Sequence, residues 1–478
     1  MKKIQVIILL LVVSINVYAE NYDFSSVCST GQTLFYNITS DSTVTVTFPN
    51  YYFQNHSTYT YYYNYQKPVG RIVIPETVLH NNTSYSVTEI DLYAFWACSG
   101  IHSVVIPNSI ISIGAYAFYG CSGIDSIYLG SGIQSFGYSS LGNCANLSYV
   151  YYNIKNGRGG VLSYGGYGAS NPYNGDIPLF NTSIHLSKVE IGDSVDTIPV
   201  YAFYNTPIDT LIISDSVQHV GDFAYYMSDQ SFYFQELYLG SAIRSIGQCS
   251  FYNRCSRLPQ IIIPESVIQI GDTAFYNCQN VQNINIGDNV RIIGNYAFYN
   301  CTNVHQLNIP DRVTNIGTYA FYGCSSVDSI YFGVNISTIG RSAFEGCSNL
   351  KWMHYNAKNL QRPLFDAWEC NRNGCGWNWG DGSYHVPFLG MNPANFKYLI
   401  IGDSVMFVPI SCFDRVSSLD TLVFNAKNCY QLDARSVFRG SHFHSCTIGD
   451  SVRRLPDYVF NKLIRPYFDS IPWKDSLH

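Results

Sequence analysis

Charged residues are scarce in this sequence of 478 residues, where Asp, Glu, Lys and Arg together make up 13%. That share is about half of what an ordinary soluble domain carries. The 27 basic residues are outnumbered by 33 acidic ones, which gives a formal net charge of −6. A nucleic-acid partner is therefore excluded, because its recognition depends on Lys and Arg that neutralise phosphates. Disorder is excluded too, since hydrophobic residues make up 47% of the chain and supply ample material for a core.

Catalytic motifs are also lacking. The sequence contains neither H-E-x-x-H nor G-x-S-x-G, the spacings found in many metalloproteases and α/β-hydrolases. Its 11 histidines are scattered, and the glycine-rich stretch near residues 157–168 lacks the lysine and the strand-to-helix context of a phosphate-binding loop. We predict a protein that is not an enzyme and that holds neither a cofactor nor a metal.

Long apolar runs are confined to the N-terminus. Lys2 and Lys3 precede an apolar stretch that ends in Val-Tyr-Ala at residues 17–19, the small-residue pattern of a signal-peptidase site. The run falls short of the roughly 20 residues that a membrane span requires. The sequence therefore predicts a signal peptide over residues 1–19, cleaved after Ala19. The mature chain is then expected to be secreted or displayed at a cell surface, with no transmembrane segment.

What the sequence does contain is a repeat. The phrase Ala-Phe-x-x-Cys recurs every 23 residues, at Phe95 and Phe118 and again at Phe275, Phe298, Phe321 and Phe344. Upstream in each copy, an alternation such as Ile284-x-Ile286 marks a strand with one buried face. A Pro or Gly ends that strand, an Ile-Gly pair makes a corner, and the Ala-Phe stretch has helix-like spacing. One unit cannot bury its apolar side alone, so the units must stack.

The fold class that follows is an α/β repeat solenoid. We expect a parallel β-sheet on its concave face, short helices and turns on its convex face, and a β-structured cap at its N-terminal end. A copy such as residues 304–321 combines Leu307-x-Ile309 with Ile316-Gly317 and Ala320-Phe321. In this pattern the chain resembles the BspA-type leucine-rich repeats of bacterial and protist surface proteins. The resemblance implies a right-handed leucine-rich-repeat solenoid and a role in adhesion, and it brings no catalytic residues.

The repeat and its interruptions divide the chain. Residues 20–70 lack the unit and are predicted to cap the solenoid, which spans residues 71–460. Two expanded coils carry loop insertions at about residues 153–188 and 357–396. Residues 461–478 form a C-terminal tail or cap.

The 15 cysteines do not read as a dense disulfide framework. Those that end each unit fall in one column, and a ladder of paired bridges would make the coils alternate, which nothing else in the pattern does. We interpret them as small buried hydrophobic residues. Cys370 and Cys375 in the second insertion are the best candidates for a disulfide, and no second cysteine pair at ligand spacing supports a metal site there.

Candidate binding residues come from the strand unit Ile-x-Ile, whose middle residue points out of the sheet. The candidates in this column are Tyr128, Tyr151, Tyr238, Tyr331 and His354, with Trp352 beside them. Tyrosine offers a large contact area at a low entropic cost, although it also simply suits a strand. The tyrosines that flank Ala-Phe are expected to be architectural.

The resemblance and the lack of catalytic motifs favour adhesion to an extracellular protein, which is a protein of a host matrix or cell surface or of another microbe. Trp368, Trp377 and Trp379 in the second insertion support an alternative, a glycan-binding surface protein, since aromatic faces stack on sugars. A passive surface-coat protein is the third possibility.

Overall fold

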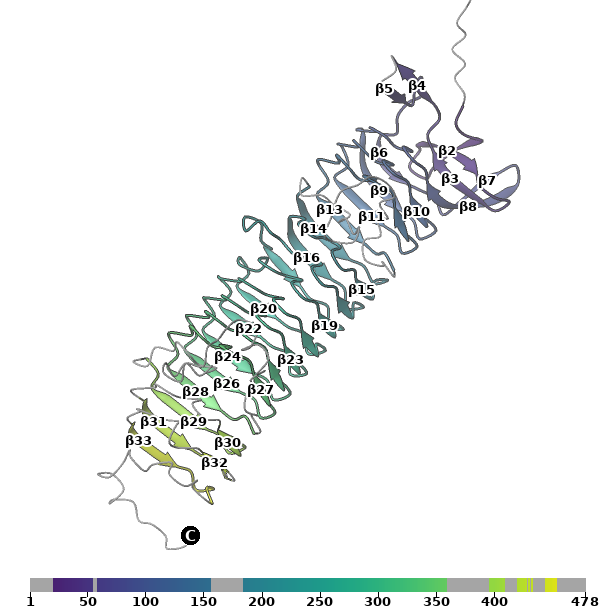
Figure 1. The fold of residues 1–478 in the computed structure, drawn as a ribbon. Helices are drawn as coiled ribbons and strands as arrows, with labels where there is room; N and C mark the ends of the chain where they lie inside the picture. The colour runs from purple at the N-terminus through teal and green to yellow at the C-terminus, as the bar shows by residue number, and fades with distance from the viewer. Residues whose placement is uncertain are drawn as a thin grey trace, which may run out of the picture.

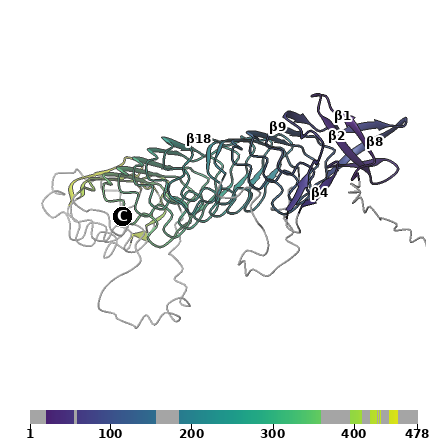
Figure 2. The ribbon, with the colours of Figure 1, turned by 90° about the horizontal axis from the view of Figure 1, so that it is seen from above.

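The computed structural model describes residues 20–54, 58–155, 184–358, 395–408, 419–427, 429, 431–432 and 443–453. The chain forms an elongated, nearly straight stack of coils, with the N-terminal strands at one end (Figure 1). Viewed at 90° to this direction, the same coils enclose a flattened tube (Figure 2). The predicted signal peptide, the bulk of both insertions and residues 461–478 lie outside the described residues.

The N-terminal end is a mixed sheet. Its strands are β1 (Phe24–Val27), β2 (Thr33–Ile38), β3 (Thr43–Thr47), β7 (Thr77–His80) and β8 (Thr83–Ile90). β1, β2 and β3 pair in antiparallel fashion, whereas β3 runs parallel to β8. β8 then pairs with β10 (Ser112–Ile113), a strand of the first coils. A separate antiparallel hairpin joins β4 (Tyr51–Gln54) to β5 (Thr58–Tyr61). The antiparallel strands are thus hydrogen-bonded directly onto the solenoid.

One side of the solenoid carries the longer parallel strands, in two sheets. The first main sheet contains β6 (Gly70–Val73), β9 (Ile101–Ile106), β11 (Ser126–Leu129), β13 (Tyr149–Tyr152), β14 (Leu186–Ile191), β16 (Ile208–Ile213) and β18 (Glu236–Tyr238). The second main sheet contains β20 (Gln260–Ile262), β22 (Asn283–Asn285), β24 (Gln306–Ile309), β26 (Ser329–Phe332), β28 (Trp352–Tyr355), β29 (Tyr398–Ile401), β31 (Leu419–Phe424) and β33 (Phe443–Ile448). Each coil contributes one strand, which confirms the predicted parallel solenoid.

A second set of strands lies where the sequence predicts only a corner, and each of these strands ends at the Ile of the Ile-Gly pair or at the equivalent residue. These two-residue strands make a parallel short-strand sheet: β15 (Thr197–Ile198), β17 (His219–Val220), β19 (Ser245–Ile246), β21 (Gln269–Ile270), β23 (Ile292–Ile293), β25 (Asn315–Ile316) and β27 (Thr338–Ile339). β12 (Ser135–Phe136) pairs with β10 in the same way, as does β30 (Phe407–Val408) with β32 (Gln431–Leu432). The glycine that follows is needed because a Cβ on Gly294 would lie 2.5 Å from the backbone of Gly271 in the preceding coil.

The predicted convex helices are wrong, because the described residues contain no helix. In the Ala-Phe stretch, Tyr296 and Asn300 adopt φ values of 56° and 62°, so left-handed residues interrupt any helical run. Alternate N–H groups there bond to the next coil and not within the turn. Phe298 N donates to Ala320 O at 2.8 Å, and Asn300 N donates to Tyr322 O at 2.7 Å. We call this side of the solenoid the turn face. Its turns stack on one another and are joined by backbone hydrogen bonds between coils.

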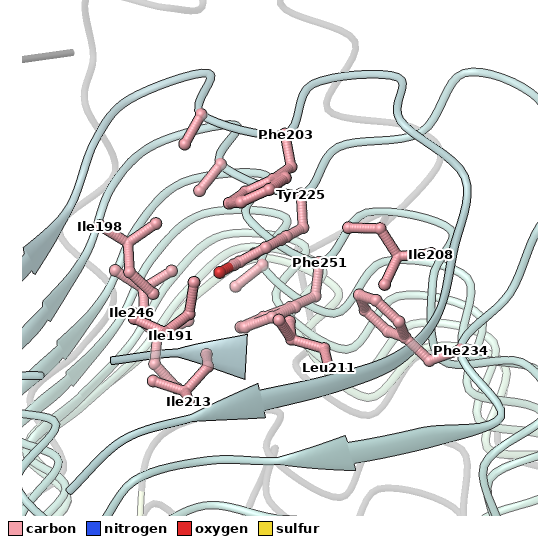
Figure 3. Packing of buried hydrophobic residues seen from close by; sticks show 14 of the residues in the cluster. Ile191, Ile198, Phe203, Ile208, Leu211, Ile213, Tyr225, Phe234, Ile246 and Phe251 are labelled. Carbon is pink, nitrogen blue, oxygen red and sulfur yellow. The ribbon is translucent and has the colours of Figure 1, made fainter. Parts of the chain in front are cut away.

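The core lies between the two kinds of sheet and the turn face. Figure 3 shows Phe203, Tyr225 and Phe251 stacked from successive coils, with Ile213 of the first main sheet and Ile246 of the short-strand sheet packed against them. Ring centroids in this column are 5.3 and 5.6 Å apart. The same column continues through the phenylalanines of the 23-residue repeat, which are fully buried. The repeat thus copies one aromatic contact from coil to coil.

The column cysteines are buried free thiols in the described residues, as the sequence analysis predicts. Five of these thiols donate to the carbonyl of the core phenylalanine in the preceding coil; Cys324 Sγ, for example, donates to Phe298 O at 3.5 Å. Burial raises the pKa of Cys98, Cys144 and Cys347 to about 12. The disulfide candidates Cys370 and Cys375 lie outside the described residues.

Candidate binding surface

The outward side chains of the main sheets form two parallel rows. We call the middle residues of the Ile-x-Ile units the outer row; it runs through Val105, Tyr128, Tyr151, Glu190, Ile212 and Tyr238 on the first main sheet, and through Ile262, Asn285, Asn308, Tyr331, His354, Ile400 and Val423 on the second. The side row lies two residues earlier on each strand. Outward and buried positions alternate, as in β11 and β13, so the predicted outward orientation is confirmed.

Three tyrosines gather on the first main sheet. Tyr128 of the outer row lies with its ring centroid 6.2 Å from that of Tyr151 and 5.5 Å from that of Tyr149 in the side row. All three rings are half-buried, so they support one another while one side of each remains in solvent. We call this group the tyrosine cluster. The sequence pattern predicts Tyr128 and Tyr151 as binding residues but not Tyr149, which lies in the side row.

Beside the tyrosine cluster lies an ion pair that the sequence analysis also missed. Glu190 continues the outer row after Tyr151; it accepts a hydrogen bond from Tyr149 Oη at 2.7 Å and forms an ion pair with Lys188. Burial raises the pKa of Glu190, but the hydrogen bonds from Lys188 and Tyr149 lower it by more, so the net shift is downward. Burial and the contact with Glu190 raise the pKa of Tyr149. The signal that places Glu190 is Val189-x-Ile191, which follows the first insertion.

A second aromatic group lies on the second main sheet. The ring centroids of Tyr331 and His354 are 4.6 Å apart, and those of Trp352 and His354 are 6.2 Å apart. Burial lowers the pKa of His354 below its ordinary value, despite the opposing charge of Asp403, so its ring is neutral at neutral pH. Tyr398, absent from the predicted candidates, pairs with Trp352 in the side row and is 48% exposed. The sequence pattern does not point to Tyr398, because it lies in the side row and not at the middle position of an Ile-x-Ile unit.

The outer row is interrupted between Tyr238 and Ile262, which lie in different sheets. At the equivalent strand starts, Gln282 and Asp328 donate N–H groups to the coil before them. Pro259 occupies that position at the break and has no N–H to donate. Tyr238 and Ile262 are 55% and 53% exposed. The predicted candidates thus fall into two groups and one edge residue, not into a single line.

Trp368, Trp377 and Trp379 lie outside the described residues. No group of three or more His, Cys, Asp or Glu side chains suited to hold a metal occurs in the described part of the chain. A search of the same residues finds no helix able to cross a membrane.

Comparison with known families identifies a family for the chain. A model described as the BspA type leucine-rich repeat region matches in six copies, over residues 76–158, 177–256, 244–367 and 391–465. These matches cover more than half of the chain. The chain belongs to the BspA-type leucine-rich repeat family. Leucine-rich repeat solenoids are typically non-catalytic and present extended surfaces for protein binding, so the family suggests a protein-interaction or adhesion role.

Solved structures similar to this BspA-type chain include three bacterial proteins. A leucine-rich repeat protein from Bacteroides ovatus is 19% identical, over 92% of this chain and 96% of that one, with a TM-score of 0.42. A leucine-rich cell surface protein from Faecalibacterium prausnitzii is 16% identical over 84% and 95%, with a TM-score of 0.28. The pneumococcal vaccine antigen PcpA is 12% identical over 90% and 99%, with a TM-score of 0.29. No curated protein matches the chain.

Proposed function

We propose that this BspA-type protein is a non-enzymatic adhesion protein, secreted or displayed at a cell surface, that binds an extracellular host protein through its outer row. The observation that carries the proposal is the tyrosine cluster, which is presented on a rigid parallel sheet. Its rings are held by 5.5 and 6.2 Å contacts, so binding costs little side-chain entropy. The predicted signal peptide and the family support an extracellular location.

Charge and exposure also favour a protein partner for the first main sheet. Lys188 and Glu190 lie at the edge of the tyrosine cluster as a mutually neutralised pair. An aromatic centre with a charged rim is the usual anatomy of a protein interface. The exposed Tyr238, at the end of the same sheet, extends this surface, and we propose Tyr331, Trp352 and His354 as further contacts on the second main sheet.

The first test is a binding screen of the mature chain, residues 20–478, against immobilised fibronectin, laminin and collagens. We expect saturable binding to at least one of them. Deleting residues 358–396 should leave that binding intact, whereas replacing Tyr128, Tyr151 and Tyr238 together by Ala should abolish it. Saturable binding that depends on residues 358–396 and ignores these tyrosines would contradict the proposal and favour the tryptophan-bearing insertion.

A further inference from the structure

Amide side chains gather on the second main sheet next to the break. Gln260, Asn283 and Gln306 follow one another along the side row, in register from coil to coil. Asn285 and Asn308 occupy the outer row on the same strands. All five side chains are exposed. We call these five residues the amide patch.

The amides of this patch have no hydrogen-bond partner among the described residues. Other asparagines of the solenoid link coils instead. Asn295 Oδ1 accepts from Thr318 N at 2.8 Å, and Asn108 Oδ1 accepts from Ser131 N at 2.8 Å. Architectural amides in this protein are thus recognisable by their bonds, and the amide patch performs no such task. Its donors and acceptors all face solvent.

The strands of the amide patch are uncharged, and aromatic side chains lie at one end of the patch. The strands β20, β22, β24 and β26 contain no charged residue. Asn308 lies in register with Tyr331, which is followed by His354, and Gln306 lies in register with Ser329, which is followed by Trp352. An array of amides therefore runs directly into a group of aromatic rings along the solenoid axis.

We propose that the amide patch, together with Tyr331 and Trp352, binds a neutral polysaccharide that lies along the solenoid axis. A side-chain amide both donates and accepts hydrogen bonds, as sugar hydroxyls do, and an aromatic face packs against the C–H face of a sugar ring. The amides recur with each coil, at the strand spacing of about 4.8 Å. A chain of like sugar units offers hydroxyls with a comparable regularity.

Other ligand classes fit this patch less well. An acidic polysaccharide would meet no Lys or Arg on these four strands. A protein interface centres on desolvated aromatic or Arg anchors, and the amide patch itself offers none. This inference goes beyond the protein-binding function proposed above, since it rests on the amide patch and a different ligand class, and the two sites share only Tyr331 and Trp352.

The test is calorimetric titration of the mature chain with neutral hexasaccharides of β-1,4-glucose, β-1,3-glucose and α-1,6-mannose, with a chondroitin sulfate hexasaccharide as the acidic probe. We expect binding of at least one neutral probe. The triple variant Asn283→Ala/Gln306→Ala/Asn308→Ala and the variant Trp352→Ala should each weaken it at least about tenfold, since each lost contact weakens binding several-fold. Asn303→Ala is the matched control, because this exposed amide lies in the same coil but outside the strands.

Two variants separate this site from the protein-binding surface. The Tyr128→Ala/Tyr151→Ala variant should bind the neutral probe as the wild type does, and the triple amide variant should retain protein binding. Should the triple variant unfold, the near-isosteric Asn283→Asp/Asn308→Asp variant places charge in the patch and is expected to lose binding as well. Absence of binding to every neutral probe, binding of the acidic probe alone, or unchanged binding by the amide variants would overturn the proposal.

Discussion

Two stretches of the solenoid show what the 23-residue repeat achieves and what its interruption costs. From Phe275 to Phe344 the core phenylalanines are stacked 5.2 to 5.4 Å apart and within 9° of parallel, and every main-sheet strand pairs with the next. Between Tyr238 and Ile262, where the main sheet is interrupted, the interval is 24 residues, as it is between Phe251 and Phe275. Regular spacing keeps the core column and the sheet ladder in register together.

The irregular stretch buries a charge as well. Residues 275–278 read Phe-Tyr-Asn-Cys, whereas residues 251–255 read Phe-Tyr-Asn-Arg-Cys. The extra residue, Arg254, is fully buried. Its Nη2 donates to Ile208 O at 3.1 Å and its Cζ lies 4.2 Å from the Phe234 ring, but Nε and Nη1 have no partner in the described residues. Burial lowers the pKa of Arg254 to about 10.

The short-strand sheet runs through the interruption without a break. β17, β19 and β21 pair in order on either side of the irregular coil. The coils therefore stay stacked where the main sheet parts, since two separate ladders connect them. Substitutions in the two stretches are expected to behave differently for these reasons.

The largest expected effect is in the regular stretch. Phe298 is fully buried between Phe275 and Phe321, with ring centroids 5.4 and 5.3 Å away. Phe298→Ala opens a cavity that the stacked coils cannot close, and should lower the free energy of unfolding by about 3 to 5 kcal/mol. Urea denaturation followed by fluorescence measures this. A loss below about 1 kcal/mol would show that the phenylalanine column is not a continuous core.

Arg254→Met, in the irregular stretch, should leave the free energy of unfolding unchanged or raise it. Replacing a buried, incompletely bonded charge by an apolar side chain of similar volume is expected to be neutral or to stabilise, by up to about 4 kcal/mol. Arg254→Ala is the contrasting variant, because it removes the charge but leaves a cavity. If Arg254→Met proves clearly destabilising in urea denaturation, the guanidinium has partners that satisfy Nε and Nη1.

Two asparagines are expected to differ by a smaller amount in their effect on stability. Asn295 bonds to Asp272 and to Thr318 N, so Asn295→Ala should cost about 1 kcal/mol of stability. Asn283 in the amide patch has no such bond, and Asn283→Ala should change stability by less than about 0.5 kcal/mol. Thermal unfolding of both variants under one condition tests the pair. Equal losses would mean that the amide patch is architectural.

Alkaline pH should lower the stability of the fold through its buried column cysteines. An unfolded thiol ionises with its ordinary pKa of 9.0, whereas folded Cys347 ionises at about 12 because of burial. The stabilisation is therefore fully present below pH 9 and declines as the pH rises from 9 towards 12. Cys347→Ala should make stability fall less steeply between pH 8 and 10.5 in urea titrations. An identical slope in the variant would contradict the buried state of this thiol.

The sequence predicted the solenoid well because period-two strands and 23-residue spacing repeat the same packing many times. It failed at the Ala-Phe stretch, where helix-like spacing concealed N–H groups of Phe298 and Asn300 that bond to the next coil. It also missed Glu190, whose strand follows an insertion of unpredictable length, and Tyr398, which lies in the side row and not at the middle position of a strand unit. The break at Pro259 was not predicted, because the repeat pattern does not show that the N–H at this position bonds to the preceding coil elsewhere in the solenoid. Local sequence patterns were enough to predict the strands of each coil, whereas the turn face and the sheet break depend on contacts between coils.

The most direct test of the central claim compares two ring pairs on different faces. Tyr128 and Tyr151 lie on the first main sheet, whereas Tyr296 and Tyr319 lie on the turn face with ring centroids 5.0 Å apart. Each pair is replaced by Ala, and surface plasmon resonance measures binding of both variants to the matrix protein that the wild type recognises. We predict that the main-sheet variant loses at least about tenfold in affinity while the turn-face variant binds as the wild type does. Loss of binding only in the turn-face variant would contradict the assignment of the binding surface.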